Sequence, residues 1–277
     1  MKSLARARVL GIVFVTLSLV MISALPMSGA AAIPNNNKWA LLIGIDQYGP
    51  LCGYHANEGC WADVARLHDV LVGHGWSPSH IMVLLNSSAT EANILAGIEW
   101  LTASSAGGMV FFYFDGHGSF GAMGLQVKSH GVERWQQNQC ICPYDVNTKT
   151  FEHAIMDVTL AACFSDCKAK QTVMMFDCCY SGGFVDECGI AGRLMMCSAA
   201  TNEMCCGSGY RGSNFLDLNG SVYTHLVLKA LAGAGDYNGN GVVSLEEAAQ
   251  YAINNIKDMS PGVNPVTYDD IAGETYL

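Results

Sequence analysis

The sequence has 277 residues, with 14 lysines and arginines against 24 aspartates and glutamates, and it carries twelve cysteines. Its net charge of −10 argues against nucleic acid or an anionic membrane surface as the main partner. Because 51% of the residues are hydrophobic, the chain is also too apolar for an intrinsically disordered protein.

The N-terminal segment has the pattern of a secretory signal. Three basic residues occupy the first eight positions, an uncharged apolar run follows over residues 9–27, and small residues fill positions 28–32. This order predicts a signal peptide over residues 1–32, cleaved after Ala30 or Ala32, and a secreted or extracytoplasmic protein. A membrane anchor that is not cleaved is the alternative, because the apolar run is long enough to enter a bilayer.

Removal of this segment changes the charge and size of the working chain. The basic residues fall from 14 to 11 while all 24 acids stay, so the net charge becomes 11 − 24 = −13. The remaining 277 − 32 = 245 residues suffice for one large domain, and we predict that residues 33–277 form it, with no membrane partner. All twelve cysteines lie in this part, in a compartment that permits disulfides.

Apolar runs alternate with helical patterns along this domain. In chain order the patterns predict a strand over 38–45, a helix over 63–72, a strand over 81–85, a helix over 88–101, a strand over 109–114, a helix over 157–168, strands over 173–176 and 194–197, and helices over 221–231 and 245–259. This alternation predicts an α/β fold in which helices cover both faces of a mostly parallel sheet of about six strands. Such sheets place their sites in the loops beyond the C-terminal ends of the strands.

Two of these loops carry groups suited to nucleophilic catalysis. The loop after 109–114 reads DGHGS and contains His117, and the loop after 173–176 reads DCCYSGG and contains Cys179. Histidine titrates near neutrality and can accept a thiol proton, and a cysteine thiolate is a strong nucleophile. A histidine in a glycine loop is usually a surface residue and a cysteine after a strand is usually core, but the two together in this order favour a Cys-His dyad.

These motifs resemble those of the caspase-like cysteine peptidases, most closely the metacaspase and prokaryotic caspase-homologue branch. The segments ALLIGIDQY at 40–48, GCWADV at 59–64 and ICPYD at 141–145 are similar to further segments of that family. The resemblance extends over about residues 39–251 and implies a three-layer α/β/α caspase-like fold. It also implies that His117 is the general base and acid, that Cys179 is the nucleophile, and that the main-chain N–H groups of Gly118 and Cys179 form the oxyanion hole.

The resemblance further implies an acidic S1 pocket. In metacaspases the acids at the positions of Asp63 and Asp177 help to line this pocket, with the cysteine at the position of Cys60 nearby. Asp115 stands where the family more often has serine; it either adds a third acid to the pocket or only caps a turn. No arginine is evident that could receive a P1 aspartate, so we expect cleavage after Arg or Lys.

A second signal is independent of the first. Residues 236–247 read DYNGNGVVSLEE and fit the twelve-residue EF-hand calcium loop, with glycine at position six and a helical pattern after it. The predicted Ca²⁺ ligands fall at positions 1, 3, 5, 7, 9 and 12 of the loop, namely Asp236, Asn238, Asn240, Val242 (through its backbone), Ser244 and Glu247. The alternative is a glycine-rich turn without an ion. Of the acids that bind calcium in metacaspases, the resemblance matches only Asp186.

We therefore predict a cysteine endopeptidase that hydrolyses protein or peptide substrates after Arg or Lys, modulated by Ca²⁺ and without an organic cofactor. It could also process itself after Arg211, which lies in a stretch rich in glycine and serine. The alternatives are a clostripain-like or legumain-like peptidase of the same fold, or a catalytically silent extracellular calcium-binding module. Disulfides are plausible among the ten cysteines other than Cys178 and Cys179, and their spacing does not favour a structural zinc site.

Overall fold

The computed structural model describes residues 33–121, 127–129, 132–134, 138–205 and 219–277. The predicted leader and Arg211 lie outside the described residues. In the described ranges, no helix combines the length and the apolar character that crossing a membrane requires.

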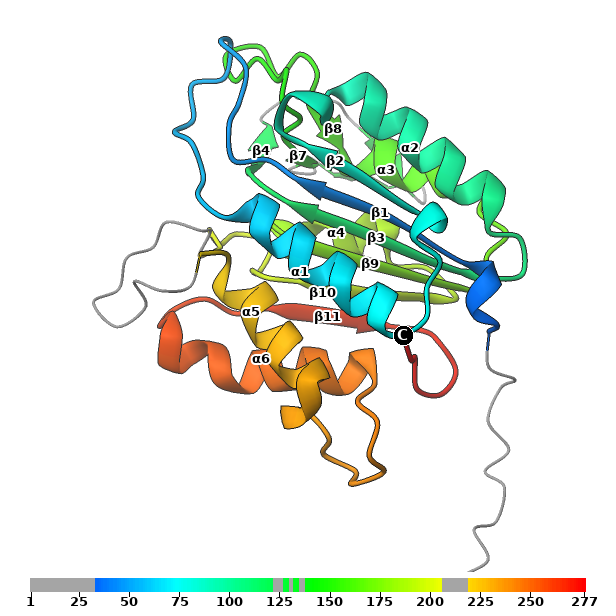
Figure 1. The fold of residues 1–277 in the computed structure, drawn as a ribbon. Coiled ribbons are helices and arrows are strands. Elements are labelled where there is room, and N and C mark those ends of the chain that lie inside the picture. The colour runs from blue at the N-terminus through cyan, green and yellow to red at the C-terminus, as the bar shows by residue number, and fades with distance from the viewer. Residues whose placement is uncertain (1–32, 122–126, 130–131, 135–137, 206–218) are drawn as a thin grey trace, which may run out of the picture.

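A six-stranded sheet forms the centre of the fold (Figure 1). Its strands, in spatial order, are β11 (Val266–Asp269), β10 (Arg193–Cys197), β9 (Gln171–Asp177), β3 (Met109–Asp115), β1 (Lys38–Gly44) and β2 (Ile81–Leu85). All neighbours pair in parallel except β10 with β11, which are antiparallel. The predicted α/β fold with a mostly parallel sheet of about six strands is therefore confirmed.

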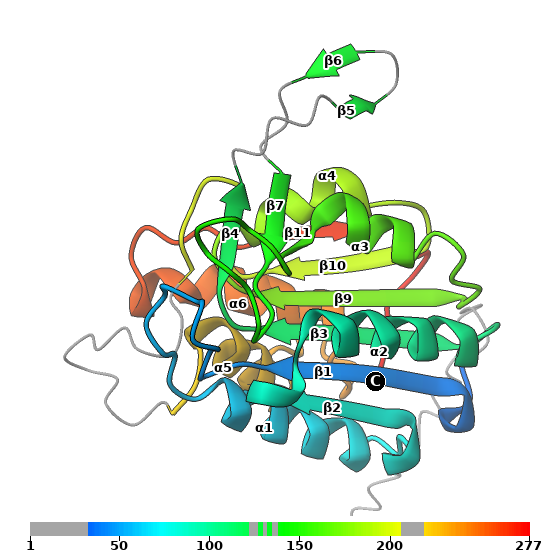
Figure 2. The same ribbon diagram turned by 90° about the horizontal axis from the view of Figure 1, so that it is seen from above.

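Smaller strands lie outside this sheet. Figure 2 shows β4 and β7 running across the direction of the central strands. They belong to a three-stranded antiparallel sheet of β4 (Gly118–Gly121), β7 (Asn138–Ile141) and β8 (Ile155–Met156), and a separate hairpin joins β5 (Val127–Ser129) to β6 (Val132–Arg134). Because β4 begins three residues after β3 ends, this small sheet directs the chain at the end of β3.

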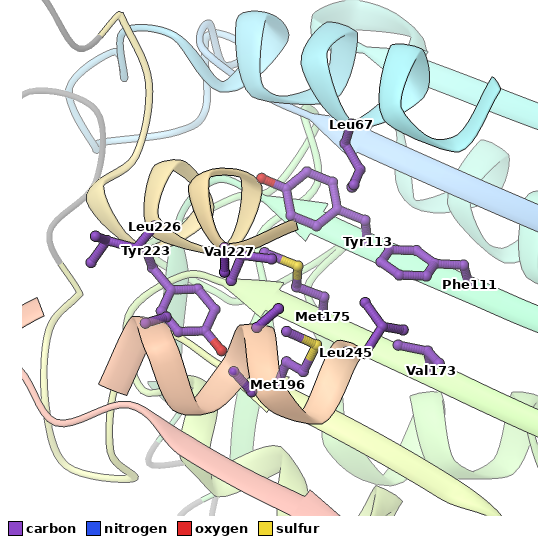
Figure 3. Close-up of a cluster of buried hydrophobic side chains, with 14 of the residues drawn as sticks. Leu67, Phe111, Tyr113, Val173, Met175, Met196, Tyr223, Leu226, Val227 and Leu245 are labelled. Atoms are coloured by element: carbon purple, nitrogen blue, oxygen red, sulfur yellow. The ribbon is translucent and has the colours of Figure 1, made fainter. Parts of the chain in front are cut away.

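Helices cover both faces of the central sheet (Figures 1 and 2). One face carries α1 (Cys60–Gly73), α5 (Val222–Lys229) and α6 (Leu245–Met259), and the other carries α2 (Glu91–Ser104), α3 (Asp157–Cys163) and α4 (Phe184–Cys188). Side chains of β3 alternate between the two cores: Phe111 and Tyr113 pack with the first group, and Phe112 and Phe114 with the second. Figure 3 shows Tyr113 in the first core, with Leu67 of α1 and Val227 of α5.

Several predicted helices have different limits in the structure. The helix expected over 88–101 begins at Glu91, because the Thr90 hydroxyl caps it by accepting from the Asn93 N–H at 3.3 Å, while Ser88 bonds to the backbone of Leu85 instead. The helix expected over 157–168 ends at Cys163. Edge strand β11 was not predicted, since its four residues, three half-exposed and one exposed, show no strong apolar pattern.

The start of α1 depends on Asp46, a buried residue in the loop after β1. Its carboxylate accepts hydrogen bonds from the N–H groups of Cys60 (2.8 Å) and Trp61 (3.1 Å). The N-cap residue itself, Gly59, has no side chain and adopts a left-handed φ of 99°. A negative group at this position also interacts favourably with the helix dipole. Asp46 thereby fixes the first turn of α1 relative to the C-terminal end of β1.

We expect Asp46→Ala to lower the free energy of unfolding by about 1–2 kcal/mol, because it removes a helix cap and leaves two N–H groups without their acceptor. Urea unfolding followed by circular dichroism measures this. Asp69→Ala is the control, since Asp69 lies on the same helix with its side chain exposed to solvent. Equal stability of the two variants would contradict the role assigned to Asp46.

Candidate active site

The register of β3 and β9 brings the two predicted catalytic loops together. Asp115 pairs with Asp177 at the ends of these strands, so His117 and Cys179 each follow two residues beyond a paired position. The Gly116 N–H donates to the Asp177 carbonyl at 3.3 Å. A Cβ atom at Gly118 would collide with the carbonyl oxygen of Cys179, so the two loops touch through their backbones. Both predicted oxyanion-hole residues, Gly118 and Cys179, therefore lie side by side.

His117 is held from both sides. Its N–H donates to the Tyr48 hydroxyl at 2.6 Å, and its ring packs near the rings of Tyr48, Tyr54 and His55. Ring atom Nε2 lies 2.7 Å from the carbonyl oxygen of His55. Because a carbonyl can only accept, Nε2 carries the proton and Nδ1 is left as the basic nitrogen. Burial lowers the pKa of His117 below its ordinary value of 6.5, which favours the neutral base.

Cys179 is half-buried, and its sulfur lies 3.8 Å from the sulfur of Cys205. A hydrogen bond from Cys205 is the largest cause that lowers the pKa of Cys179 from 9.0 to about 7, against the opposing effect of burial. The next residue, Tyr180, has a left-handed φ of 62°, and its N–H donates to the Glu203 carbonyl at 2.7 Å. Sequence reasoning missed Cys205, because no spacing rule links it to Cys179.

The three acids predicted for the S1 pocket form one buried cluster. Asp63, Asp115 and Asp177 are 0%, 2% and 1% exposed. Burial raises the pKa of Asp63 to about 6, and it raises the pKa of Asp115 well above the ordinary value, with the charges of the other two acids adding to the effect. Asp115 thus belongs to the cluster and does not cap an exposed turn. The Cys60 side chain forms a hydrogen bond to Asp115, so all four predicted S1 residues meet.

Hydroxyl groups from β3 and α5 support this cluster. One carboxylate oxygen of Asp177 accepts from the Ser221 hydroxyl, the Thr224 hydroxyl (2.8 Å) and the Thr224 N–H (3.1 Å). Asp115 accepts from the Tyr113 hydroxyl at 3.3 Å. The Ser221 and Thr224 donors oppose the effect of burial on the pKa of Asp177, which is nevertheless raised above its ordinary value.

Arg66 is a further member of the cluster that the sequence reasoning missed. Its Nη2 atom lies 2.6 Å from a carboxylate oxygen of Asp63 and 2.8 Å from the carbonyl of Asn219. The i,i+3 spacing of Asp63 and Arg66 on α1 was the available signal. The sequence analysis expected no arginine placed to receive a P1 aspartate, and it did not single out Arg66. Because it is paired with Asp63, it does not present a free cation to a P1 aspartate.

The predicted calcium loop is folded as a compact turn. Asp236 accepts from the N–H groups of Asn240 (3.1 Å) and Gly241 (3.0 Å), and Gly241, at position six, has φ of 85°. The oxygens of Asn238 and Asn240 accept from N–H groups two residues further on. The Glu247 carboxylate folds back over the loop and accepts from three of its N–H groups, those of Tyr237, Asn238 and Ser244.

This loop provides the oxygen ligands that a hard cation prefers, but only two of its six predicted ligands are carboxylates, those of Asp236 and Glu247. Glu274, near the C-terminus, adds a nearby carboxylate that accepts from the Asn238 side chain at 2.9 Å. Over the described ranges, no group of three or more His, Cys, Asp or Glu side chains is arranged to hold a metal. The donor set therefore fits a weak calcium site. Asp186, the other predicted calcium residue, is exposed on α4.

The remaining predictions concern the cysteines and the cleavage site. Eleven cysteines fall within the described ranges, and all of them are free thiols there. Export through residues 1–32 and self-cleavage after Arg211 stay predictions from the sequence.

Comparison with known proteins agrees with this geometry. Residues 38–188 match the family described as metacaspase, peptidase C14 domain. Metacaspase-1 of Plasmodium falciparum (isolate 3D7) is 34% identical over 166 residues, which is 55% of this chain and 25% of that protein. Metacaspase-7 of Arabidopsis thaliana is 28% identical over 160 residues, 54% of this chain and 36% of that protein. The similarity thus spans about a quarter to a third of the length of these two relatives.

A crystal structure of a Geobacter sulfurreducens protein has the same fold, with a TM-score of 0.57 at 14% identity over 87% of this chain and 94% of that one. The family match covers more than half of the chain and includes both loops at the ends of β3 and β9. The chain therefore belongs to the metacaspase family of cysteine peptidases.

Proposed function

We propose that the protein is a cysteine endopeptidase in which Cys179 is the nucleophile and His117 the general base and acid. The observation that carries the proposal is the in-register end of β3 and β9, which places the two loops in backbone contact. A half-buried thiol whose pKa is lowered to about 7 is the second support, since the thiolate is the attacking species.

The geometry supports a sequence of steps for peptide hydrolysis. Nδ1 of His117 takes the Cys179 proton, and the thiolate attacks the scissile carbonyl carbon. The N–H groups of Gly118 and Cys179 stabilise the oxyanion, and protonated His117 then gives its proton to the leaving amine. Water hydrolyses the resulting acyl-enzyme and restores the thiol. The His55 carbonyl holds the imidazole in one tautomer throughout.

The pKa of Cys179 predicts how activity depends on pH. Below about pH 7 the thiol is protonated and unreactive, so both kcat/KM and the rate of alkylation by iodoacetamide should rise with a midpoint near 7 instead of 9. Cys205→Ala removes the largest cause of the shift, so its midpoint should move toward 9. Cys179→Ala should lower kcat/KM by a factor of about 10³ or more. A midpoint near 9 in the unchanged protein would contradict this account.

We also propose specificity for Arg or Lys at P1, on the basis of the cluster of Asp63, Asp115 and Asp177. The cluster holds three carboxylates against one guanidinium, and their raised pKa values report burial and mutual repulsion. A substrate cation would relieve this repulsion, whereas a P1 aspartate would add a fourth acid. Arg66 supports the proposal from within the chain, because a guanidinium already binds Asp63 there. Its side chain is 41% exposed and can leave for solvent when a substrate enters.

Asp63→Asn should lower kcat/KM for fluorogenic Arg and Lys substrates at least about tenfold, mainly through KM, because one partner of a buried charge pair is lost. Asp69→Asn, on the exposed side of the same helix, is the matched control and should leave both constants unchanged. Asn and Asp substrates are assayed in parallel under reducing conditions. Cleavage after Asp by the unchanged protein would contradict the pocket assignment, and hydrolysis of none of the substrates would favour the silent calcium-binding module.

We further propose that residues 236–247 bind Ca²⁺ with modest affinity. The supporting observation is the folded turn in which the N–H of Gly241 donates to Asp236, leaving oxygens of Asp236, Asn238 and Asn240 on one short loop. Asp236 and Glu247 would supply the charge, and the amide and backbone oxygens would complete the coordination. The helix α6 begins at Leu245, inside this loop, and packs against α5. Because the first turn of α5 donates a hydrogen bond to Asp177, bound calcium would stabilise the helix pair that supports the acidic cluster.

Calorimetric titration of the full chain with CaCl₂ tests this site. We expect Asp236→Ala to weaken binding at least about tenfold, because it removes one of the two carboxylates among the predicted ligands. Asp258→Ala, an exposed acid on α6, should bind like the unchanged protein. Identical titrations for Asp236→Ala and the unchanged protein would rule out the loop, and comparing peptidase rates in CaCl₂ and in EGTA shows whether binding affects activity.

A further inference from the structure

The contact between Cys179 and Cys205 has a chemical consequence beyond peptide hydrolysis. Their sulfur atoms lie 3.8 Å apart, and both residues are half-buried. A disulfide has a sulfur–sulfur distance of about 2.05 Å, so closing this bond requires a shift of about 1.8 Å. Side-chain rotation together with a small backbone movement supplies shifts of this size.

The segment that carries Cys205 is held in place by contacts other than the two sulfurs. The Tyr180 N–H donates to the Glu203 carbonyl, two residues before Cys205. The Glu203 carboxylate in turn accepts from the backbone N–H (2.9 Å) and side-chain amide (2.7 Å) of Asn264, which precedes β11. The Ser181 hydroxyl accepts from the Ala199 N–H at 3.0 Å. The closeness of the two thiols is therefore supported by backbone and side-chain contacts of the two residues that follow Cys179 and of the segment before Cys205.

We propose that Cys179 and Cys205 form a reversible redox modification site, in which a peroxide oxidises Cys179 and Cys205 resolves the product as a disulfide. In the first step the Cys179 thiolate attacks one oxygen of hydrogen peroxide, the O–O bond breaks, and hydroxide leaves to be protonated to water. This leaves a sulfenic acid on Cys179. In the second step the Cys205 sulfur attacks that sulfur, the S–O bond breaks, and a second water is formed. A dithiol reductant restores both thiols by exchange.

The two thiols are suited to different roles. Hydrogen bonding between them lowers the pKa of Cys179 and raises the pKa of Cys205, so Cys179 is the one that reaches the reactive thiolate form. Cys178 is the neighbour in sequence but is fully buried, and burial raises its pKa well above the ordinary value. Cys178 therefore competes neither as the attacking thiol nor as the resolving one.

The disulfide would block catalysis and would also protect Cys179 from irreversible oxidation. It removes the nucleophile, so the peptidase would be inactive while oxidised, and it prevents the sulfenic acid from reaching the irreversible sulfinic state. The effect on catalysis rests on the proposed function, but the formation of the disulfide does not. The two can therefore be tested separately on the same samples.

The test treats the full reduced chain with a small molar excess of hydrogen peroxide and maps peptides by mass spectrometry without reduction. We expect a loss of about 2 Da, a cross-linked peptide pair joining Cys179 to Cys205, and full recovery of alkylatable Cys179 with dithiothreitol. Cys205→Ser keeps a hydroxyl donor beside Cys179 but cannot convert a sulfenic acid on Cys179 into a disulfide. In that variant Cys179 should gain about 32 Da as the sulfinic acid and should not recover. Cys163→Ser, a half-buried cysteine on α3, is the matched control and should behave like the unchanged chain.

Two results would overturn the proposal: a cross-link from Cys179 to a cysteine other than Cys205, or the same irreversible oxidation of Cys179 in the unchanged chain and in Cys205→Ser. Peptidase assays on the same samples separate this inference from the proposed function. A reversible cross-link in a protein that cleaves no substrate would contradict the peptidase and support the redox site. If the unchanged chain is an active peptidase and peroxide abolishes that activity irreversibly, the result would support the peptidase and contradict the redox site.

Discussion

Parallel, in-register pairing of β3 with β9 is the constraint on which the rest of the site depends. Both strands are buried on both faces, and the side chains of β3 alternate between two separate cores. A slip of one residue would exchange these faces and bring Tyr113 into the core that now holds Phe112 and Phe114. The register is therefore fixed by packing along the whole strand. Its effect at the strand ends is that the loops carrying His117 and Cys179, far apart in the sequence, come into backbone contact.

The same pairing has an electrostatic cost. It puts Asp115 directly beside Asp177, and α1 adds Asp63, so the fold buries three acids that repel one another. Hydroxyl groups from α5 and the guanidinium of Arg66 offset part of this cost. Burying like charges without full compensation is unfavourable for stability, which makes the cluster hard to explain as a purely structural device. The proposed specificity for Arg or Lys at P1 would give these buried acids a function.

Sequence reasoning was strongest where the chemistry follows a local pattern. The strands with continuous apolar residues, and the loops with His117 and Cys179 after them, could be predicted because each signal lies within a few neighbouring residues. Asp46 and Cys205 could not, since their roles depend on contacts across 14 and 26 positions that only the folded chain makes. Arg66 lies between these cases. Its spacing from Asp63 is a local signal, but the burial of Asp63, which makes the pair part of the acidic cluster, cannot be read from that spacing.

Cys205 links the reactivity of the nucleophile to its vulnerability. Donation of a hydrogen bond by its thiol stabilises the Cys179 thiolate, and a thiolate reacts with a carbonyl carbon and with a peroxide oxygen for the same electronic reason. A donor that could not itself be oxidised, such as a serine hydroxyl, would activate Cys179 and leave it exposed to irreversible damage. A second thiol activates it and also supplies the group that can capture the first oxidation product. If both proposals hold, one contact of 3.8 Å would serve the reaction in reducing conditions and preserve the nucleophile in oxidising ones.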